Sequence, residues 1–257
     1  LPFINGTVSQ NSIAKGDRVF ITGTSTGVRN KELLIWIFGD TFTHIDKIYV
    51  NPDSSYSYEI PPIITKTLIP GSYVALVQHP MMNNEFDIYF DDSKSYVRYN
   101  YGTKKGNILF LMQGASSLHG FDAFNALVQS FGDPLVDDIY EFDVFQIENP
   151  EIWIEPINDT QQGEKITIVS TTNLSVGNQI LIELEELPSD ITRKKFGYQY
   201  SNFSLGISVV IKGDPDKNKI ALDLDTSTIK PGEYLFKESA MDIDVKSSVK
   251  FKVIEKK

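Results

Sequence analysis

The chain has 257 residues and contains no cysteine. This absence excludes disulfide bonds, catalytic thiolates, iron–sulfur clusters, thiolate-ligated zinc and covalently attached c-type haem. Histidine is scarce too: His44, His79 and His119 lie far apart and form neither an HExxH nor an HxH pattern. Because a zinc site needs several converging ligands, the sequence predicts no histidine-based metal site.

Catalytic motifs are missing as well. The GxSxG, phosphate-binding-loop and dinucleotide-binding patterns do not occur. Ser117 and His119 are close in sequence, but a catalytic triad is defined in space and not by sequence proximity. The 34 acidic residues make chance pairs of carboxylates inevitable, and none lies in a recognisable glycosidase context. We therefore expect a protein that is not an enzyme, with no catalytic and no cofactor-binding residues.

Long apolar runs are absent, since the best one, residues 33–38, is far too short to cross a membrane. The net charge is -10 and the pI is about 4.8, so the chain should repel nucleic acid and anionic lipid. The acidic residues are scattered in pairs such as Asp137-Asp138 and form no tail. We expect no nucleic-acid partner and no membrane span in this chain. Its acidic surface is either simply solvated or binds cations such as calcium.

Hydrophobic residues make up 41% of the chain, which is enough for a folded core, and they follow an internal repeat. Residues 13–24 and 161–172 both contain a glycine turn, a charged pair and an alternating strand. Later, Pro70-Gly71-Ser72-Tyr73 matches Pro231-Gly232-Glu233-Tyr234. In each, a Pro-Gly turn precedes a strand that opens with Tyr. The repeat predicts two copies of one kind of domain.

Many short alternating segments separated by turn residues predict a β-sandwich in each copy. We therefore predict a mainly β protein with two Ig-like β-sandwich domains, although the Cys–Trp–Cys signature is absent. The boundary is expected at Glu148-Asn149-Pro150, which gives domains 1–148 and 149–257. The second copy is longer, and its extra residues are expected to form a hairpin between Glu185 and Lys217.

The first domain is predicted to carry an insertion of about residues 85–147. Within it, residues 120–131 have apolar side chains at the i, i+3, i+4, i+7 spacing of an amphipathic helix. Gly132 can adopt the left-handed conformation that ends a helix. We expect this helix to pack on the first domain, between a buried strand near residues 107–112 and a strand near residues 140–147.

A calcium-binding loop is weakly suggested by oxygen-bearing side chains at alternate positions, at Asp214, Asp216 and Asn218. An EF-hand loop requires Gly at its sixth position and Glu at its twelfth, where this chain has Lys219 and Asp225. The segment fits an ordinary acidic hairpin turn better, so the three residues are weak metal candidates. Calcium is the one cofactor that the sequence brings into consideration.

Four Asn-x-Ser/Thr sequons lie near predicted turns or strand ends, where a glycan can be accommodated. In an exported protein, their occupation would make the chain a glycoprotein. The glycosylation candidates are Asn5, Asn158, Asn173 and Asn202.

Aromatic residues are plentiful. Trp36 and Trp153 lie in apolar segments, which predicts core packing. A tyrosine-rich stretch is either a binding face for sugar or protein, since Tyr suits interfaces, or a half-buried strand edge, which we favour. The polar and aromatic residues of this stretch are Tyr89, Tyr96, Arg98, Tyr99, Asn100 and Tyr101.

The first ten residues include Phe3, Ile4 and Val8, which are our subunit-contact candidates. Such an apolar segment can add a strand to a neighbouring subunit by β-augmentation. Alternatively, it forms the first strand of its own domain, which we favour. The chain starts at Leu1 and not at Met, which fits either removal of a signal peptide or a boundary within a longer protein.

Three segments together, Ile35–Gly39, Pro70–Asn83 and Phe121–Gln129, resemble a poorly characterised family of exported surface proteins from methanogenic archaea and their relatives. The resemblance extends to Thr171–Gly177 in the second copy. It implies Ig-like repeats and a surface-layer or sheath-like role. Some members of the family carry a signal peptide and a C-terminal membrane anchor, and this sequence shows neither. The resemblance carries over no catalytic residues.

We therefore expect a non-enzymatic structural protein of the archaeal cell surface. It would form a homo-oligomer or polymer through β-edges and build a surface layer, a sheath or an extracellular filament. The alternative is an extracellular adhesin or carbohydrate-binding module, assisted by calcium and with a surface glycan as partner. An enzyme with an unrecognised site is a third hypothesis, and it requires a deep pocket with convergent polar groups.

Overall fold

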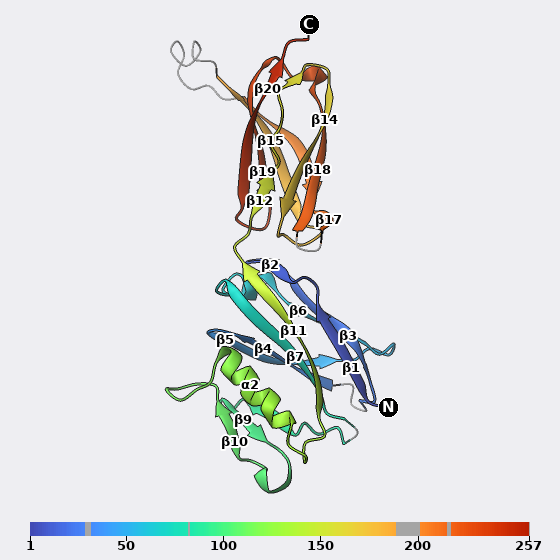
Figure 1. Cartoon of the computed structure of the whole chain (residues 1–257), viewed down its shortest axis with the longest axis vertical. Helices are drawn as coiled ribbons and strands as arrows, with labels where there is room; N and C mark the ends of the chain where they lie inside the picture. Colours follow the sequence, from blue (N-terminus) through green and yellow to red (C-terminus); the bar gives the residue numbers. More distant parts are fainter. Residues whose placement is uncertain (29–31, 82, 189–200, 215–216, 257) are drawn as a thin grey trace. The chain divides into compact units, whose positions relative to one another are not determined.

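The computed structural model describes residues 1–28, 32–81, 83–188, 201–214 and 217–256 (Figure 1). The chain divides into two compact units, Leu1–Glu148 and Asn149–Lys257, and each unit has its own two-sheet β-sandwich. The molecule is mainly β, with Ig-like sandwiches, and the predicted fold class is confirmed. None of the described helices is long and apolar enough to cross a membrane.

The first unit is a sandwich of a three-stranded and a five-stranded sheet. Strand order defines its topology, with β1-β3-β6 in one sheet and β2-β11-β7-β4-β5 in the other. All neighbouring strands are antiparallel except β2 and β11, which is the immunoglobulin-like arrangement. The strands are β1 (Phe3–Val8), β2 (Ser12–Ala14), β3 (Val19–Thr26), β4 (Glu32–Gly39), β5 (Phe42–Tyr49), β6 (Ser55–Ile60), β7 (Gly71–His79) and β11 (Ile139–Glu148).

The second unit repeats this strand order. Its sheets run β12-β14-β18-β17 and β13-β20-β19-β15-β16, and β13 again pairs in parallel with the last strand, β20. Strand β17 is an addition at one edge. The strands are β12 (Ile152–Ile154), β13 (Thr160–Gln161), β14 (Lys165–Thr172), β15 (Gln179–Leu187), β16 (Ser201–Val209), β17 (Ile211–Asp214), β18 (Lys217–Asp225), β19 (Gly232–Ala240) and β20 (Lys246–Ile254).

The extra length of the second copy lies around β16 and β17. Strand β16 pairs with β15, and β17 pairs with β18. The two strands belong to different sheets, so they do not form the single additional hairpin expected between Glu185 and Lys217. Residues 189–200 of that stretch lie outside the described residues.

A tyrosine corner occurs in both units. The Tyr73 hydroxyl donates a 2.8 Å hydrogen bond to the carbonyl oxygen of Ile69, and Tyr234 does the same to Lys230 at 2.8 Å. Such a hydrogen bond back from an early residue of the strand is a hallmark of immunoglobulin-like sandwiches. The Pro-Gly-x-Tyr repeat in the sequence is therefore the repeat of this corner.

A second hydrogen bond is also repeated. A short helix precedes each corner: α1 (Pro62–Thr65) in the first unit and η2 (Thr226–Thr228) in the second. The Thr65 hydroxyl donates to the Asp17 carbonyl at 2.6 Å, and the Thr226 hydroxyl donates to the Glu164 carbonyl at 2.8 Å. These carbonyls follow the two glycine turns of the repeat, so this bond fastens each corner to the start of a core strand.

Strand β4 is buried on both faces, which explains its uninterrupted apolar run. Leu33, Ile35 and Ile37 point into the core between the two sheets of the first unit. Trp36 and Phe38 belong to a second apolar cluster on the opposite face of the same sheet. Because successive side chains of a strand point to opposite faces, a strand covered on both sides needs apolar residues throughout.

The cover on that outer face is an insertion between β7 and β11. It contains a small sheet of order β10-β9-β8 and the helix α2, which contacts β4, β7 and β10 (Figure 1). The predicted helix over residues 120–131 is confirmed. The elements are β8 (Ile88–Asp91), β9 (Tyr96–Tyr99), η1 (Gly102–Lys104), β10 (Ile108–Leu111) and α2 (Gly120–Phe131).

The predicted end of the insertion at residue 147 is wrong. Residues 139–147 lie in β11, a full member of the sandwich that pairs with both β7 and β2. Tyr140 stacks on Phe131 of α2, and Phe142 meets Phe124 of the same helix edge to face. Phe145 and Ile147 enter the sandwich core. Strand β11 contacts apolar side chains on both of its faces, so its sequence does not alternate regularly between apolar and polar residues. For this reason the sequence alone does not show that β11 belongs to the sandwich and not to the insertion.

Candidate functional site

Three carboxylates converge where the insertion leaves and rejoins the sandwich. Asp87 directly precedes β8, and Asp137 and Asp138 directly precede β11. One oxygen from each residue lies within 4.8 Å of the others. Asp87 is 6% exposed and Asp138 is 5% exposed, while Asp137 is exposed. The cluster is therefore buried on one side and open to solvent on the other.

Neutral hydrogen-bond donors hold this cluster together. Asp138 Oδ2 accepts bonds from Gln78 Nε2 at 2.6 Å and from the Asp87 backbone N–H at 2.8 Å. Asp87 Oδ2 accepts from the Asp137 backbone N–H at 2.8 Å. Asn83 Nδ2 donates to Asp137 Oδ1 at 2.9 Å. The two ends of the insertion are thus tied to each other and to β7.

Burial of these groups changes their acidity. It raises the pKa of Asp138 to about 7, and hydrogen bonds from Gln78 and Asp87 only partly oppose this. Burial likewise raises the pKa of Asp87. No lysine or arginine in the described part of the chain forms an ion pair with Asp87, Asp137 or Asp138. The site gathers negative charge without a protein cation, and its oxygen ligands suit a hard cation.

The residues that the sequence put forward for calcium lie elsewhere. Asp214 is exposed, with Oδ2 3.8 Å from Lys219 Nζ. Asn218 is buried and its Nδ2 donates to the Leu174 carbonyl at 2.7 Å, while Asp216 lies outside the described residues. Asn218 thus stabilises the fold of the second unit, and Asp214 pairs with a lysine. For the cluster of Asp87, Asp137 and Asp138, the visible signal in the sequence was an aspartate directly before each of two strands.

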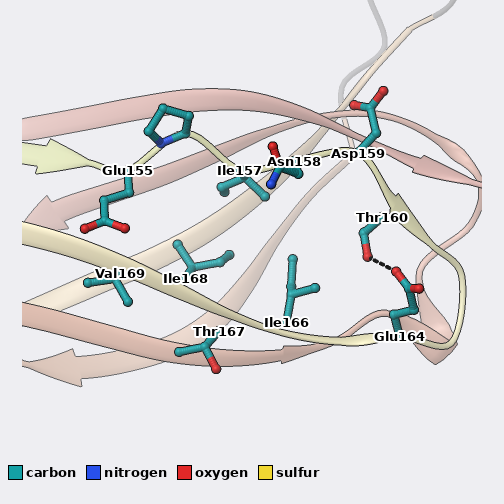
Figure 2. Close-up of a pocket in the computed structure, with 11 residues that line it drawn as sticks. Glu155, Ile157, Asn158, Asp159, Thr160, Glu164, Ile166, Thr167, Ile168 and Val169 are labelled. Atoms are coloured by element: carbon teal, nitrogen blue, oxygen red, sulfur yellow. Dashed lines mark hydrogen bonds between the residues drawn. The ribbon is translucent and has the colours of Figure 1, made fainter.

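The second unit has an open pocket of about 400 Å³ between residues 155–160 and β14 (Figure 2). Ile157, Ile166 and Ile168 give it apolar walls. Glu164 accepts hydrogen bonds from the Thr160 hydroxyl at 2.7 Å and the Gln161 N–H at 2.8 Å, which lower its pKa. Among the described residues, its lining includes the carboxylates of Glu155, Asp159 and Glu164 but no histidine, lysine or serine. Glu164 closes a turn here.

The sequons occupy different surroundings. Asn5 and Asn158 are exposed. Asn173 is 5% exposed, and its amide donates to the Asn149 carbonyl at 2.8 Å and accepts from the Glu151 N–H at 2.9 Å. Its place as a glycosylation candidate is therefore corrected, because the nitrogen that would carry a glycan is buried and bonded. Asn202 lies in β16, and its side chain is outside the described part.

The N-terminal segment forms the first strand of its own unit. β1 pairs antiparallel with β3 over its whole length. Ile4 and Val8 are buried in the sandwich core, and Phe3 is exposed. Of the three subunit-contact candidates, Phe3 alone lies on the surface, because the folded unit already uses the other two.

The tyrosine-rich stretch is partly buried in β8 and β9, and its rings contact charged groups of the same unit. Arg98 lies over the Tyr96 ring at 5.0 Å, and Lys104 lies over the Tyr99 ring at 5.2 Å. The Tyr101 hydroxyl donates to Asp133 at 2.9 Å. These contacts fit the half-buried strand edge better than an open binding face.

Two further sequence features have local roles. Ser117 Oγ lies 2.8 Å from His119 Nε2 and 2.6 Å from the Gly114 carbonyl, which it bonds as donor. This hydroxyl therefore closes the turn before α2. Trp153 was expected in the core, but it is 37% exposed, with Lys217 Nζ 3.7 Å from its ring centroid. Its neighbour Ile152 in strand β12 is buried, and successive side chains of a strand point to opposite faces, so Trp153 lies on the solvent face of its sheet.

Comparison with known proteins gave structural matches alone. No protein family and no curated protein matches the sequence. A tetra-tandem repeat from the extending region of a large adhesion protein matches at 12% identity and a TM-score of 0.34, covering 98% of this chain and 49% of that one. A bacterial ice-binding adhesin of 1.5 MDa matches at 10% identity and a TM-score of 0.31, covering 99% and 65%.

Tandem immunoglobulin domains of titin match at 8% identity and a TM-score of 0.25, covering 99% of this chain and 97% of that one. The chain thus spans about half the length of the first adhesion-protein match and 65% of the second. TM-scores this low do not bear on function. The assignment of Ig-like sandwiches follows from the strand order of each unit.

Proposed function

We propose that the chain is a non-enzymatic structural segment of an extracellular cell-surface protein, built from tandem Ig-like modules. The observation that carries the proposal is the duplication of one sandwich with the same strand order and the same tyrosine corner. Tandem modules lengthen a chain, and this role requires no catalytic site. The proposal locates the protein outside the cell or on its surface.

The start of the second module supports this role. β11 ends at Glu148 and β12 begins at Ile152. Within the second unit, Asn173 bonds both Asn149 and Glu151, and the Thr172 hydroxyl donates to the Glu151 carbonyl at 2.7 Å. The connecting residues are therefore fixed to their module by hydrogen bonds and do not form a free linker.

Self-association through a sheet edge is the second part of the proposal, and a second copy of this chain is the partner. Within the described residues, β16 is the terminal strand of its sheet. Ile207 is 56% exposed and Val209 is 45% exposed on β16, and Ile211 on β17 is 50% exposed. An edge strand with unpaired backbone groups and exposed apolar side chains is a template for pairing with another chain.

We base the kind of surface assembly on the resemblance to exported proteins of methanogenic archaea. It makes the chain part of an archaeal surface layer, sheath or extracellular filament, with glycans at Asn5 or Asn158. A surface adhesin is the alternative, in which the modules present a binding region and do not polymerise.

Light scattering and negative-stain electron microscopy across a concentration series test the self-association. Wild-type chain is expected to form oligomers or filaments, and Ile207→Lys with Val209→Lys should remove them, because a charged edge resists pairing. Val176→Lys is the matched control, since Val176 is 55% exposed in the same unit but outside the strands. A wild-type chain that stays monomeric at every concentration contradicts self-association and favours the adhesin.

A further inference from the structure

The charged form of the buried carboxylates at the insertion is unfavourable without a positive partner. Asp87 and Asp138 are almost fully buried, and transfer of a carboxylate away from water is unfavourable unless the charge is paired. Their hydrogen-bond donors are a glutamine amide and backbone N–H groups, which carry no net charge. The exposed Asp137 adds a third carboxylate to the same place.

An unpartnered oxygen provides an independent observation. Asp138 Oδ2 accepts two hydrogen bonds. Asp138 Oδ1 is buried as well, but no hydrogen-bond donor in the described part of the chain reaches it. Because a buried polar atom without a partner is unfavourable, this oxygen is available as a ligand for a bound cation.

The spacing fits one ion. Two oxygens that each lie about 2.4 Å from a single calcium ion can be at most about 4.8 Å apart, and the three carboxylates place one oxygen each within 4.8 Å of the others. Calcium accepts six to eight oxygen ligands in flexible geometry, and water supplies those that the protein does not. The exposed Asp137 provides an open side for entry and for such waters.

We propose that Asp87, Asp137 and Asp138 bind a divalent cation of the calcium type, which fastens both ends of the insertion to the sandwich. Asp87 belongs to the segment that leads into β8, and Asp137 and Asp138 lead into β11. Through Gln78 the ion is joined to β7 and to the buried Trp36. All three ligands are carboxylate oxygens, which suit hard cations such as calcium and magnesium.

Isothermal titration calorimetry of the whole chain tests the site, after the chain has been dialysed against EDTA. Calcium chloride and magnesium chloride are titrated separately. Calcium is expected to bind at one saturable site with a Kd of about 10⁻⁴–10⁻³ M, in the weak range of protein calcium sites, and more tightly than magnesium. Hydrogen exchange at the Asp87 and Asp137 amides, which bond inside the cluster, should slow when calcium is added.

Asp137→Asn is the main variant, because an exposed position tolerates the change. It should weaken calcium binding by about tenfold or more, since ligand charge sets affinity. Asp138→Asn should abolish calcium binding. If circular dichroism shows that this variant does not fold, the test of the site depends on Asp137→Asn. Asp214→Asn is the matched control, because Asp214 lies in the second unit and pairs with a lysine. It should bind calcium with the affinity of the wild type.

Absence of saturable binding up to about 10 mM calcium overturns the site. So does an Asp137→Asn variant with unchanged affinity, because the ion would then lie elsewhere. The site does not rest on the proposed function. A monomer that binds calcium keeps the site and loses the self-association, whereas filaments that bind no calcium do the reverse.

Discussion

The indole Nε1 of Trp36 donates a 2.8 Å hydrogen bond to Oε1 of Gln78, and both side chains are completely buried. The Gln78 amide nitrogen in turn donates to the Ile88 carbonyl at 2.9 Å and to Asp138. One glutamine thus joins strand β4, strand β7 and both ends of the insertion. Buried hydrogen bonds of this kind strengthen one another in a low-dielectric interior and favour one arrangement of the core.

Gln78→Leu should destabilise the first unit by about 2–4 kcal/mol, because it leaves the Trp36 donor and a carboxylate oxygen without their partner. The free energy of unfolding in urea, followed by Trp fluorescence, measures the loss. Gln129→Leu, at an exposed position of α2, is the control and should change stability by less than about 0.5 kcal/mol. Equal effects of the two variants would contradict a structural role for the network.

The tyrosine corners provide a paired test. Tyr73→Phe and Tyr234→Phe each remove one hydroxyl that bonds a carbonyl four residues upstream. Each should cost about 1 kcal/mol, and each in its own unit. Chemical denaturation that resolves the two units measures this. Tyr49→Phe, 63% exposed, should have no measurable effect, and a Tyr234→Phe variant that weakens the first unit would contradict independent corners.

Glu238 should make the second unit less stable at alkaline pH. It is 1% exposed, and burial raises its pKa from 4.5 to about 7, with partial opposition from Ser170. The folded unit therefore holds the proton more tightly than the unfolded chain. Its contribution to stability is complete below about pH 4.5 and is lost as the pH rises through 7, by about 3 kcal/mol in total.

Urea unfolding at pH 5 and pH 8 measures this dependence. Glu238→Gln stays neutral at both values, so it should unfold at a higher urea concentration than wild type at pH 8 and near the wild-type value at pH 5. Glu233→Gln, exposed on the same strand, is the control. An identical pH dependence in wild type and Glu238→Gln would show that another group causes it.

Leu127→Ala should loosen the insertion. Leu127 is fully buried in α2, inside the apolar cluster that also contains Trp36 and Phe38. Truncation of a buried leucine to alanine costs about 2–5 kcal/mol. The unfolding transition of the first unit should move to lower temperature while that of the second stays in place. Asn125→Ala, exposed on the same helix, should leave both transitions unchanged.

Local patterns in the sequence predicted much of the fold. A Pro-Gly turn followed by Tyr depends on backbone conformation over a few residues, so the turns and strands at Tyr73 and Tyr234 were recognisable, although the hydrogen bonds of the tyrosine corners were not. The helical spacing before Gly132 was equally local. Residues 139–147 were misplaced, because strand pairing with β7 is a long-range contact that leaves no mark on the residues themselves.

The cluster of Asp87, Asp137 and Asp138 could not be predicted from the sequence for the same reason. Asp87 and Asp138 belong to opposite ends of the insertion, and only the closed β7–β11 pair brings them together. Adjacent acidic residues were visible at Asp137-Asp138, but pairs of this kind are also common on solvated surfaces. The loop at Asp214 showed a better ligand spacing in sequence, yet Asp214 pairs with a lysine. Spacing in sequence identifies ligands only where they share one loop.

The insertion should also make the two units fold at different rates. His79 pairs with Ile139 across the whole insertion, whereas Ser239 pairs with Lys246 across a short turn. Closing a longer loop costs more entropy before its contacts form, and folding slows as sequence separation grows. Two copies of one topology should therefore fold at different speeds. The N-terminal unit leaves the ribosome first, but the C-terminal unit should be the faster of the two to reach its native sheets.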